Sequence, residues 1–208
     1  MKKVLFSAAV LATILFSCCQ NANNQQVVEQ KNETMTTILA RRSIRAYKQN
    51  TVPQSALDTI ILAAINAPSA RNYQPWEMRV IKNREIIAEI ENGVLAMRKA
   101  ENPDYEPRPV FHGAPVLLVV AYDKSNIFGQ VDCGWFGQNI LLAAHSLGLG
   151  TCVVANANGF YNSNAGKNVM AKLNFSENYE VIYSISLGYP NETPEAKPRN
   201  ATKVQIVE

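Results

Sequence analysis

Hydrophobic and polar positions follow two different rhythms along the chain. A period of three to four residues, typical of helices, runs through residues 53–66. Its apolar stripe, of the kind that faces a core, consists of Leu57, Ile60, Ile61, Ala64 and Ile65. The same period predicts a short helix over 34–41, a helix that Asn83 caps, and a helix over 164–173.

Other segments predict strands. Residues 76–82 and 179–187 alternate apolar and polar side chains, as in a strand with one buried face. Residues 116–122 are apolar almost without a break, which indicates a strand buried on both faces. Shorter strands are expected over 149–155 and, at a sheet edge, over 202–207. Because helices and strands alternate irregularly, the pattern favours an α+β fold with a helix-covered sheet.

Residues 131–147 are apolar nearly all round, so we expect a central helix that is buried on every side. Gly134 and Gly137 cost stability in a helix interior, and we therefore expect another helix or a ligand to approach them closely. Two segments read as loops: residues 101–115, which contain four prolines, and the polar turn 156–162.

The N-terminus has a pattern of its own. Two lysines precede an apolar run over 4–16, which is too short to span a membrane and is typical of a secretory signal. The run ends before Cys18 in a setting similar to a bacterial lipobox. We therefore expect a signal peptide over 1–17, a lipidated, disordered tether over 18–33 and a folded domain over 34–208. The alternative is an ordinary cleaved signal with a chance cysteine.

A lipidated Cys18 would make this an exported protein, held on a bacterial membrane through its lipid without spanning the bilayer. The 208 residues, 47% of them hydrophobic, suit one domain with an ordinary core. A net charge of +3 argues against a nucleic-acid partner, and the two His and four Cys lack the spacing of a metal site.

Three residues of the apolar segments raise narrower questions. Cys133 and Cys152, the thiols of the expected domain, could pair, but burial as small apolar fillers is more typical. His145 lies in the apolar helix, where a hydrogen-bonded core residue is more common than a catalytic one.

The residues that carry chemistry fall in two short runs. The first, Arg41-Arg42-Ser43-Ile44-Arg45, places three guanidinium groups and a hydroxyl within five residues. Arginine stays charged and donates two parallel hydrogen bonds to phosphate oxygens, so this run is a candidate anion clamp. The alternative is a solvated basic turn.

The second run, residues 67–76, holds Ser69, Asn72 and Gln74 between two prolines that stiffen the loop. A stiff loop with converging donors and acceptors, leading into a tryptophan, suits a flat heteroaromatic ligand. The alternative is a simple turn between a helix and a strand.

Together these motifs resemble the nitroreductase family of FMN-dependent NAD(P)H oxidoreductases, and the chain is similar to a short, lipid-anchored member. The likeness spans about residues 36–199. It also rests on Gly113-Ala114-Pro115, on Asp132, on Gln138-Asn139-Ile140-Leu141-Leu142-Ala143-Ala144-His145-Ser146-Leu147-Gly148-Leu149-Gly150, and on Lys197-Pro198-Arg199. The resemblance implies a mixed, mainly antiparallel sheet covered by helices, in an intertwined homodimer with FMN at the interface.

The resemblance also implies which residues bind the cofactor. The phosphate and ribityl chain would contact Arg41, Arg42, Ser43, Arg45, Lys197 and Arg199. The partner subunit would line the flavin with Pro68, Ser69 and Ala70. Asn72 would contact the ring edge, with Gln74 on the same loop, and Asn158 and Gly159 would lie near the amide that faces flavin N5.

The implied reaction passes hydride from NAD(P)H through flavin N5 to a nitroaromatic, a quinone or a similar small aromatic acceptor, by a ping-pong mechanism. FMN carries this chemistry, so no catalytic side chain and no metal are expected. An exported protein meets little NAD(P)H, however. The alternative is therefore an exported flavin-binding lipoprotein without NAD(P)H turnover.

Overall fold

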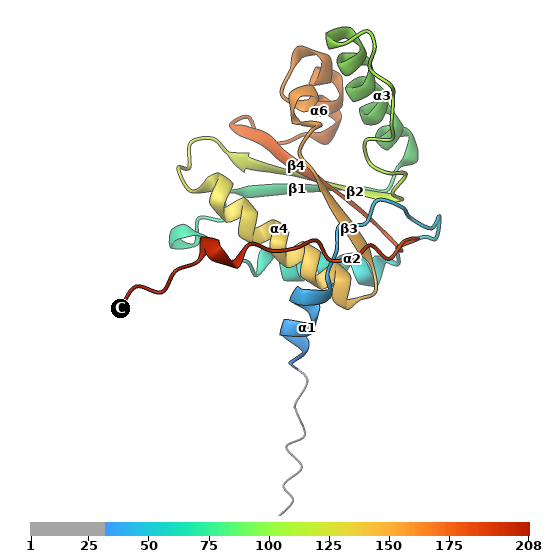
Figure 1. The fold of residues 1–208 in the computed structure, drawn as a ribbon. Helices are drawn as coiled ribbons and strands as arrows, with labels where there is room; N and C mark the ends of the chain where they lie inside the picture. Colours follow the sequence, from blue (N-terminus) through green and yellow to red (C-terminus); the bar gives the residue numbers. More distant parts are fainter. Residues whose placement is uncertain (1–31) are drawn as a thin grey trace, which may run out of the picture. The chain divides into compact units, whose positions relative to one another are not determined.

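The computed structural model describes residues 32–208. The expected signal peptide and lipidation site at Cys18 lie outside the described residues. The described chain forms one four-stranded antiparallel sheet between two helical layers (Figure 1). In spatial order the strands are β1 (Trp76–Ile81), β2 (Val116–Asp123), β4 (Tyr179–Gly188) and β3 (Gly150–Val154).

The two central strands, β2 and β4, hold both cores in place. Alternate side chains of β2 enter opposite cores: Val116, Leu118 and Val120 on one face, and Leu117, Val119 and Ala121 on the other. All six are buried, which confirms the expectation of a strand covered on both faces.

A different set of helices covers each face of the sheet (Figure 1). On one face lie α2 (Gln54–Ile65) and α4 (Gly129–Ser146), with α1 (Glu33–Ala40) against α4. On the other lie α3 (Arg84–Glu101), α5 (Asn158–Tyr161) and α6 (Lys167–Leu173). Short 3-10 turns occur at η1 (Ala70–Asn72), η2 (Asn164–Gly166) and η3 (Ala201–Lys203). The expected α+β fold is confirmed, and Asn83 caps α3 by accepting from two backbone amides.

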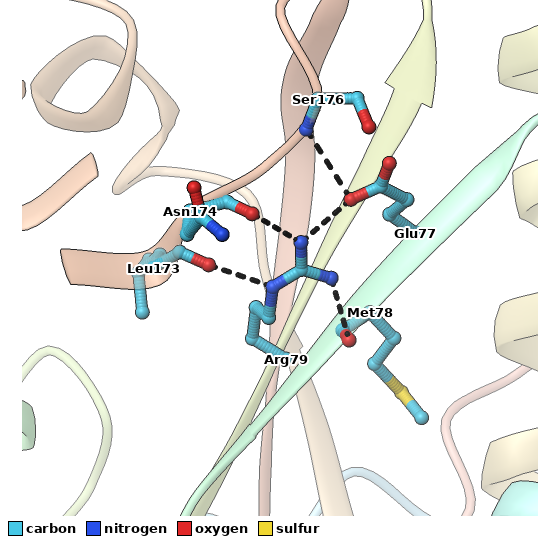
Figure 2. A network of polar contacts seen from close by, with 6 residues as sticks. All are labelled: Glu77, Met78, Arg79, Leu173, Asn174 and Ser176. Atoms are coloured by element: carbon cyan, nitrogen blue, oxygen red, sulfur yellow. Dashed lines mark hydrogen bonds and ion pairs between the residues drawn. The ribbon is translucent and has the colours of Figure 1, made fainter. Parts of the chain in front are cut away.

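A polar junction ties the end of α6 to β1 (Figure 2). The Arg79 guanidinium donates to the carbonyls of Leu173 (2.6 Å) and Asn174 (2.5 Å) and pairs with the Glu77 carboxylate at 2.7 Å. The same carboxylate accepts from the backbone amide of Ser176. These contacts hold the turn between α6 and β4 against the edge strand.

Two expectations about the C-terminal half are wrong. Residues 156–162, expected as a polar turn, contain the short helix α5. The surrounding asparagines make the segment polar overall, but Phe160 and Tyr161 pack into the core. There the Tyr161 hydroxyl contacts the Ser184 hydroxyl. Residues 202–207, expected as an edge strand, form no strand, because the chain turns at η3 and the apolar side chains of Val204, Ile206 and Val207 then face solvent.

Helix α4 is buried on one side only, which corrects the expectation of a helix buried all round. Phe136 and Ile140 enter the core, whereas Val131 and Trp135 are 56% and 53% exposed. Positions 131 and 135 are one turn apart, so they share a face.

Gly134 and Gly137, in the interior of α4, have unlike surroundings. Gly137 lies under the Tyr183 ring of β4, whose hydroxyl donates to the Cys133 carbonyl. An atom added at Gly134 would meet nothing within 4 Å. The expected close neighbour is therefore present at Gly137 only, and it is Tyr183 of the sheet, where we expected another helix or a ligand. Cys133 and Cys152 are both buried, and within residues 32–208 neither forms a disulfide, as is typical of small fillers.

Candidate functional site

Basic groups from both ends of the sequence meet at one cavity of about 190 Å³. The residues that line it include Arg41, Arg42, Ser43, Arg45, Lys197 and Arg199. These are the six positions that the family resemblance implies for the FMN phosphate and ribityl chain. We call this cavity the clamp. Glu195 is the acidic residue among its lining.

Backbone pairing fixes the first half of the clamp. Ser43 forms a parallel bridge with Thr151 of β3, and the Ile44 amide donates to the Thr151 carbonyl at 2.9 Å. Tyr47 pairs with Pro190, just after β4. A side-chain carbon at Gly150 would lie 2.7 Å from Ile44, so the close approach of this segment to β3 requires glycine there. Backbone pairing with the sheet therefore fixes the position of the segment that carries the arginines.

The charges of the clamp repel one another. Burial lowers the pKa of Arg41, and the neighbouring Arg42 and Arg199 lower it further. Burial, together with Arg41 and Arg42, also lowers the pKa of His145. His145 is half-buried beside the arginines, which corrects our expectation of a core histidine. An anion between the guanidinium groups would relieve this repulsion.

The second run forms a held loop. Arg71, Asn72 and Gln74 all have positive φ, at 51°, 58° and 49°, a region that side chains other than glycine seldom adopt. The Gln74 backbone amide donates to the Ser69 hydroxyl at 3.1 Å, and its side-chain amide donates to the Asn72 side chain at 3.2 Å. The polar groups are thus fixed to one another, and strain of this kind is common at ligand sites.

The loop and the clamp lie at opposite ends of α4. The Ala70 amide donates to the buried Asp132 carboxylate in the first turn of α4. His145, in the last turn, lines a cavity together with Arg41 and Arg42. At about 1.5 Å per residue, roughly 20 Å of helix separates Asp132 from His145. Within one chain, the structure therefore does not bring the loop positions Pro68, Ser69, Ala70, Asn72 and Gln74 to the clamp.

The family model of the nitroreductase family matches residues 38–189, which include the arginine run and the loop. This chain belongs to the nitroreductase family. A putative NADH dehydrogenase/NAD(P)H nitroreductase of Methanothermobacter thermautotrophicus is 35% identical over 170 residues. That alignment covers 79% of this chain and 81% of the relative.

Solved structures agree with this assignment. A nitroreductase with bound FMN from Bacteroides fragilis superposes with a TM-score of 0.79 at 27% identity, covering 85% of this chain and 100% of that one. A nitroreductase with bound FMN from Desulfitobacterium hafniense gives 0.75 at 32% identity, covering 85% and 99%. The fold of this nitroreductase-family chain is therefore the one that its sequence implies.

Asn158 and Gly159 do not face the clamp. The Asn158 side-chain amide donates to the Ile182 carbonyl of β4, and its buried oxygen accepts no hydrogen bond from any described residue. Gly159 lies beside Met97 of α3. Val154, Ala155 and Asn156, which precede α5, line a second cavity.

That second cavity has a volume of about 400 Å³ and shares Arg45 with the clamp. Its lining adds side chains that sequence reasoning missed: Arg98, Tyr105, Arg108 and His112. Three of them, Tyr105, Arg108 and His112, lie on the proline-rich loop, which had no periodic pattern to mark them as functional. We call this space the side cavity.

Over residues 32–208, we find no helix with the length and apolar character needed to cross a bilayer. Nor does this part of the chain bring together three or more metal-ligating side chains.

Proposed function

We propose that this protein is an FMN-dependent oxidoreductase that transfers hydride from NAD(P)H to a small aromatic acceptor by a ping-pong mechanism. The observation that carries the proposal is the clamp, where Arg41, Arg45 and Arg199 converge from distant parts of the sequence. The family relationship and the FMN bound in related structures support the same cofactor.

The residues present fit a flavin phosphate. The cavity offers several guanidinium groups, one ammonium and the Ser43 hydroxyl against a single carboxylate, at Glu195. Arginine binds phosphate through paired, charge-assisted hydrogen bonds. Arg45 remains available, because its backbone amide, and not its side chain, makes the contact with the Glu192 carboxylate. Arg41, Arg42, Lys197 and Arg199 would hold the phosphate together with it.

When bound, FMN supplies hydride acceptance and donation at N5, and the protein supplies position and charge. With a quinone, NAD(P)H and one proton give NAD(P)⁺ and the hydroquinone. With a nitroaromatic, the same two electrons and two protons give the nitroso compound and water. Neither reaction needs a side-chain nucleophile, so the chain's own task is to anchor the cofactor and to admit the two substrates in turn.

We propose a homodimer as the active form, because the loop over residues 67–76 and the clamp lie at opposite ends of α4. About 20 Å separates these two ends within one chain. Apolar side chains remain exposed on the α1, α2 and α4 layer: Leu39, Leu62, Ile65, Val131 and Trp135. Exposed apolar groups gathered on one layer are typical of protein interfaces. A partner packed there would supply the missing loop, with Ser69 and Asn72, to each clamp.

An absorbance spectrum of the purified protein tests this function directly. We expect a bound yellow chromophore that bleaches with NADH or NADPH and reoxidises with menadione. Flavin that stays oxidised with both donors would favour the alternative, an exported flavin-binding protein without NAD(P)H turnover. Colourless protein that FMN cannot reconstitute would contradict both.

We also propose that Cys18, outside the described residues, is lipidated and anchors the exported protein to a bacterial membrane. The support is the N-terminal pattern of two lysines, an apolar run and a cysteine. Detergent phase partitioning of the full chain and of Cys18→Ser tests this. We expect the native protein in the detergent phase and the variant in the aqueous phase, whereas equal partitioning would contradict the anchor.

A further inference from the structure

The side cavity is basic on several walls. Arg45 comes from the clamp segment, Arg98 from α3, and Arg108 and His112 from the proline-rich loop. Among the described residues, none of those that line it is an aspartate or a glutamate. Cationic groups from three separate segments thus face one space with no acid in its lining, and such a space favours an anionic ligand. Glu91 and Glu192, which act to raise the pKa of His112 against the lowering by burial, lie outside that lining.

Arg98 is held in place by contacts with neutral groups, and it forms no ion pair with any residue in the described part of the chain. Its guanidinium donates to the Tyr105 hydroxyl at 3.0 Å and to the Asn156 carbonyl at 3.0 Å. It also lies 5.7 Å from the centre of the Tyr105 ring. These partners are neutral, so they position the positive charge of Arg98 between α3, the proline-rich loop and the end of β3 without neutralising it.

Arg108 lies between two points at which hydrogen bonds fix the proline-rich loop. On one side is Tyr105, bound to Arg98. On the other, the Glu91 carboxylate of α3 accepts the backbone amides of Val110 and Phe111. Arg108 itself makes no hydrogen bond or ion pair with any described residue. Because the backbone on both sides of Arg108 is held, a ligand would have to order only its side chain, which is free to bind an anion.

We propose that the side cavity binds the carboxylate of an aromatic acid, which serves as the electron acceptor, between Arg98 and Arg108. This rests on the proposed function, since Arg45 lines both cavities and places the side cavity next to the cofactor clamp. A volume of about 400 Å³ accommodates one aromatic ring with an acidic group. The protein would then prefer acidic acceptors over neutral ones of the same shape.

Two measurements test the acid preference. The first is the affinity of benzoate, which cannot be reduced, measured by titration calorimetry. The second is the ratio of kcat/KM for 4-nitrobenzoate to that for 4-nitrobenzyl alcohol. We expect Arg108→Gln to lower both the affinity and the ratio by about tenfold or more, as for loss of a charge-assisted hydrogen bond. Arg108→Lys should retain part of each, because it keeps the charge.

Arg84→Gln is the matched control, since it removes an arginine from the first turn of the same helix, α3, away from the cavity. It should change neither quantity. If Arg108→Gln also leaves both unchanged, the proposal is overturned. It is likewise overturned if the variant alters only the preference for NADPH over NADH, because the anion would then be the phosphate of the donor.

Benzoate binding separates this proposal from the proposed function. If the protein proves colourless and without turnover, but Arg108→Gln still weakens benzoate binding, the carboxylate site stands and the oxidoreductase assignment fails. If the protein is yellow and active on menadione, but benzoate binding does not depend on Arg108, the assignment stands and the carboxylate site fails.

Discussion

At the scale of single residues, the clamp is defined by charges that the fold forces together. Burial and two neighbouring arginines lower the pKa of Arg41, so the unliganded cluster is electrostatically unfavourable. The run around Arg45 could be predicted from the sequence, because its groups are adjacent in the chain. Arg98 and Arg108 could not, because only the packing of the loop on α3 makes them neighbours of one cavity.

The clamp predicts a specific loss in Arg45→Ala. Loss of a charge-assisted phosphate contact costs about 1.5–3 kcal/mol, which corresponds to FMN binding roughly 10- to 100-fold weaker. Quenching of flavin fluorescence during titration of the apoprotein measures the affinity. Arg84→Ala is the control on an exposed surface, and unchanged affinity in Arg45→Ala would count against the phosphate assignment.

At the scale of elements, binary patterning predicted the four strands and the longer helices, because each buries a periodic face. It failed for α5, where two core aromatics are hidden among asparagines. It also failed for the outer face of α4. An apolar residue such as Trp135 predicts a buried position, but the pattern does not tell whether the chain's own core or another molecule covers it.

The contact between Gly137 of α4 and Tyr183 predicts that one added methyl group costs more stability in the native protein than in the Tyr183→Phe variant. A side-chain carbon at Gly137 would lie 2.9 Å from Cζ of Tyr183, in a packed core. Gly137→Ala should therefore cost about 1–3 kcal/mol of unfolding free energy through overpacking. The Tyr183→Phe background should recover part of that loss, because it removes the hydroxyl nearest the new methyl. Urea unfolding of both variants measures the difference, and equal losses in both backgrounds would contradict the packing argument.

The junction between α6 and β1 predicts a dependence of stability on pH. Burial raises the pKa of Glu77, but hydrogen bonds from Ser176 and Arg79 outweigh it and hold the pKa below its ordinary 4.5. The stabilisation is therefore complete above the unfolded-state pKa and is lost as pH falls through the folded-state value.

Glu77→Gln isolates this contribution. Urea unfolding at about pH 6 and about pH 3 should show a larger loss of stability for the native protein than for the variant, whose side chain does not titrate. If the two proteins lose the same free energy over this range, the carboxylate of Glu77 does not stabilise the junction (Figure 2).

At the scale of the whole molecule, the apolar layer of α1, α2 and α4 predicts assembly. Trp135 is 53% exposed in the single chain, and an aspartate there would place a charge in the proposed interface. Trp135→Asp should be monomeric by light scattering and should have lost most of its bound flavin. Ala88→Asp, on the exposed side of α3 in the other layer, should remain dimeric. A native protein that is itself monomeric and yellow would refute the arrangement.

The separation of clamp and loop along α4 has a genetic consequence. In the proposed dimer, each subunit would contribute two half-sites and no complete one. A chain defective at Arg45 and a chain defective at Asn72 would each be inactive alone. Mixed together, they would rebuild one sound centre in every hybrid, or about a quarter of the native complement after random exchange. Two broken alleles would thus complement each other.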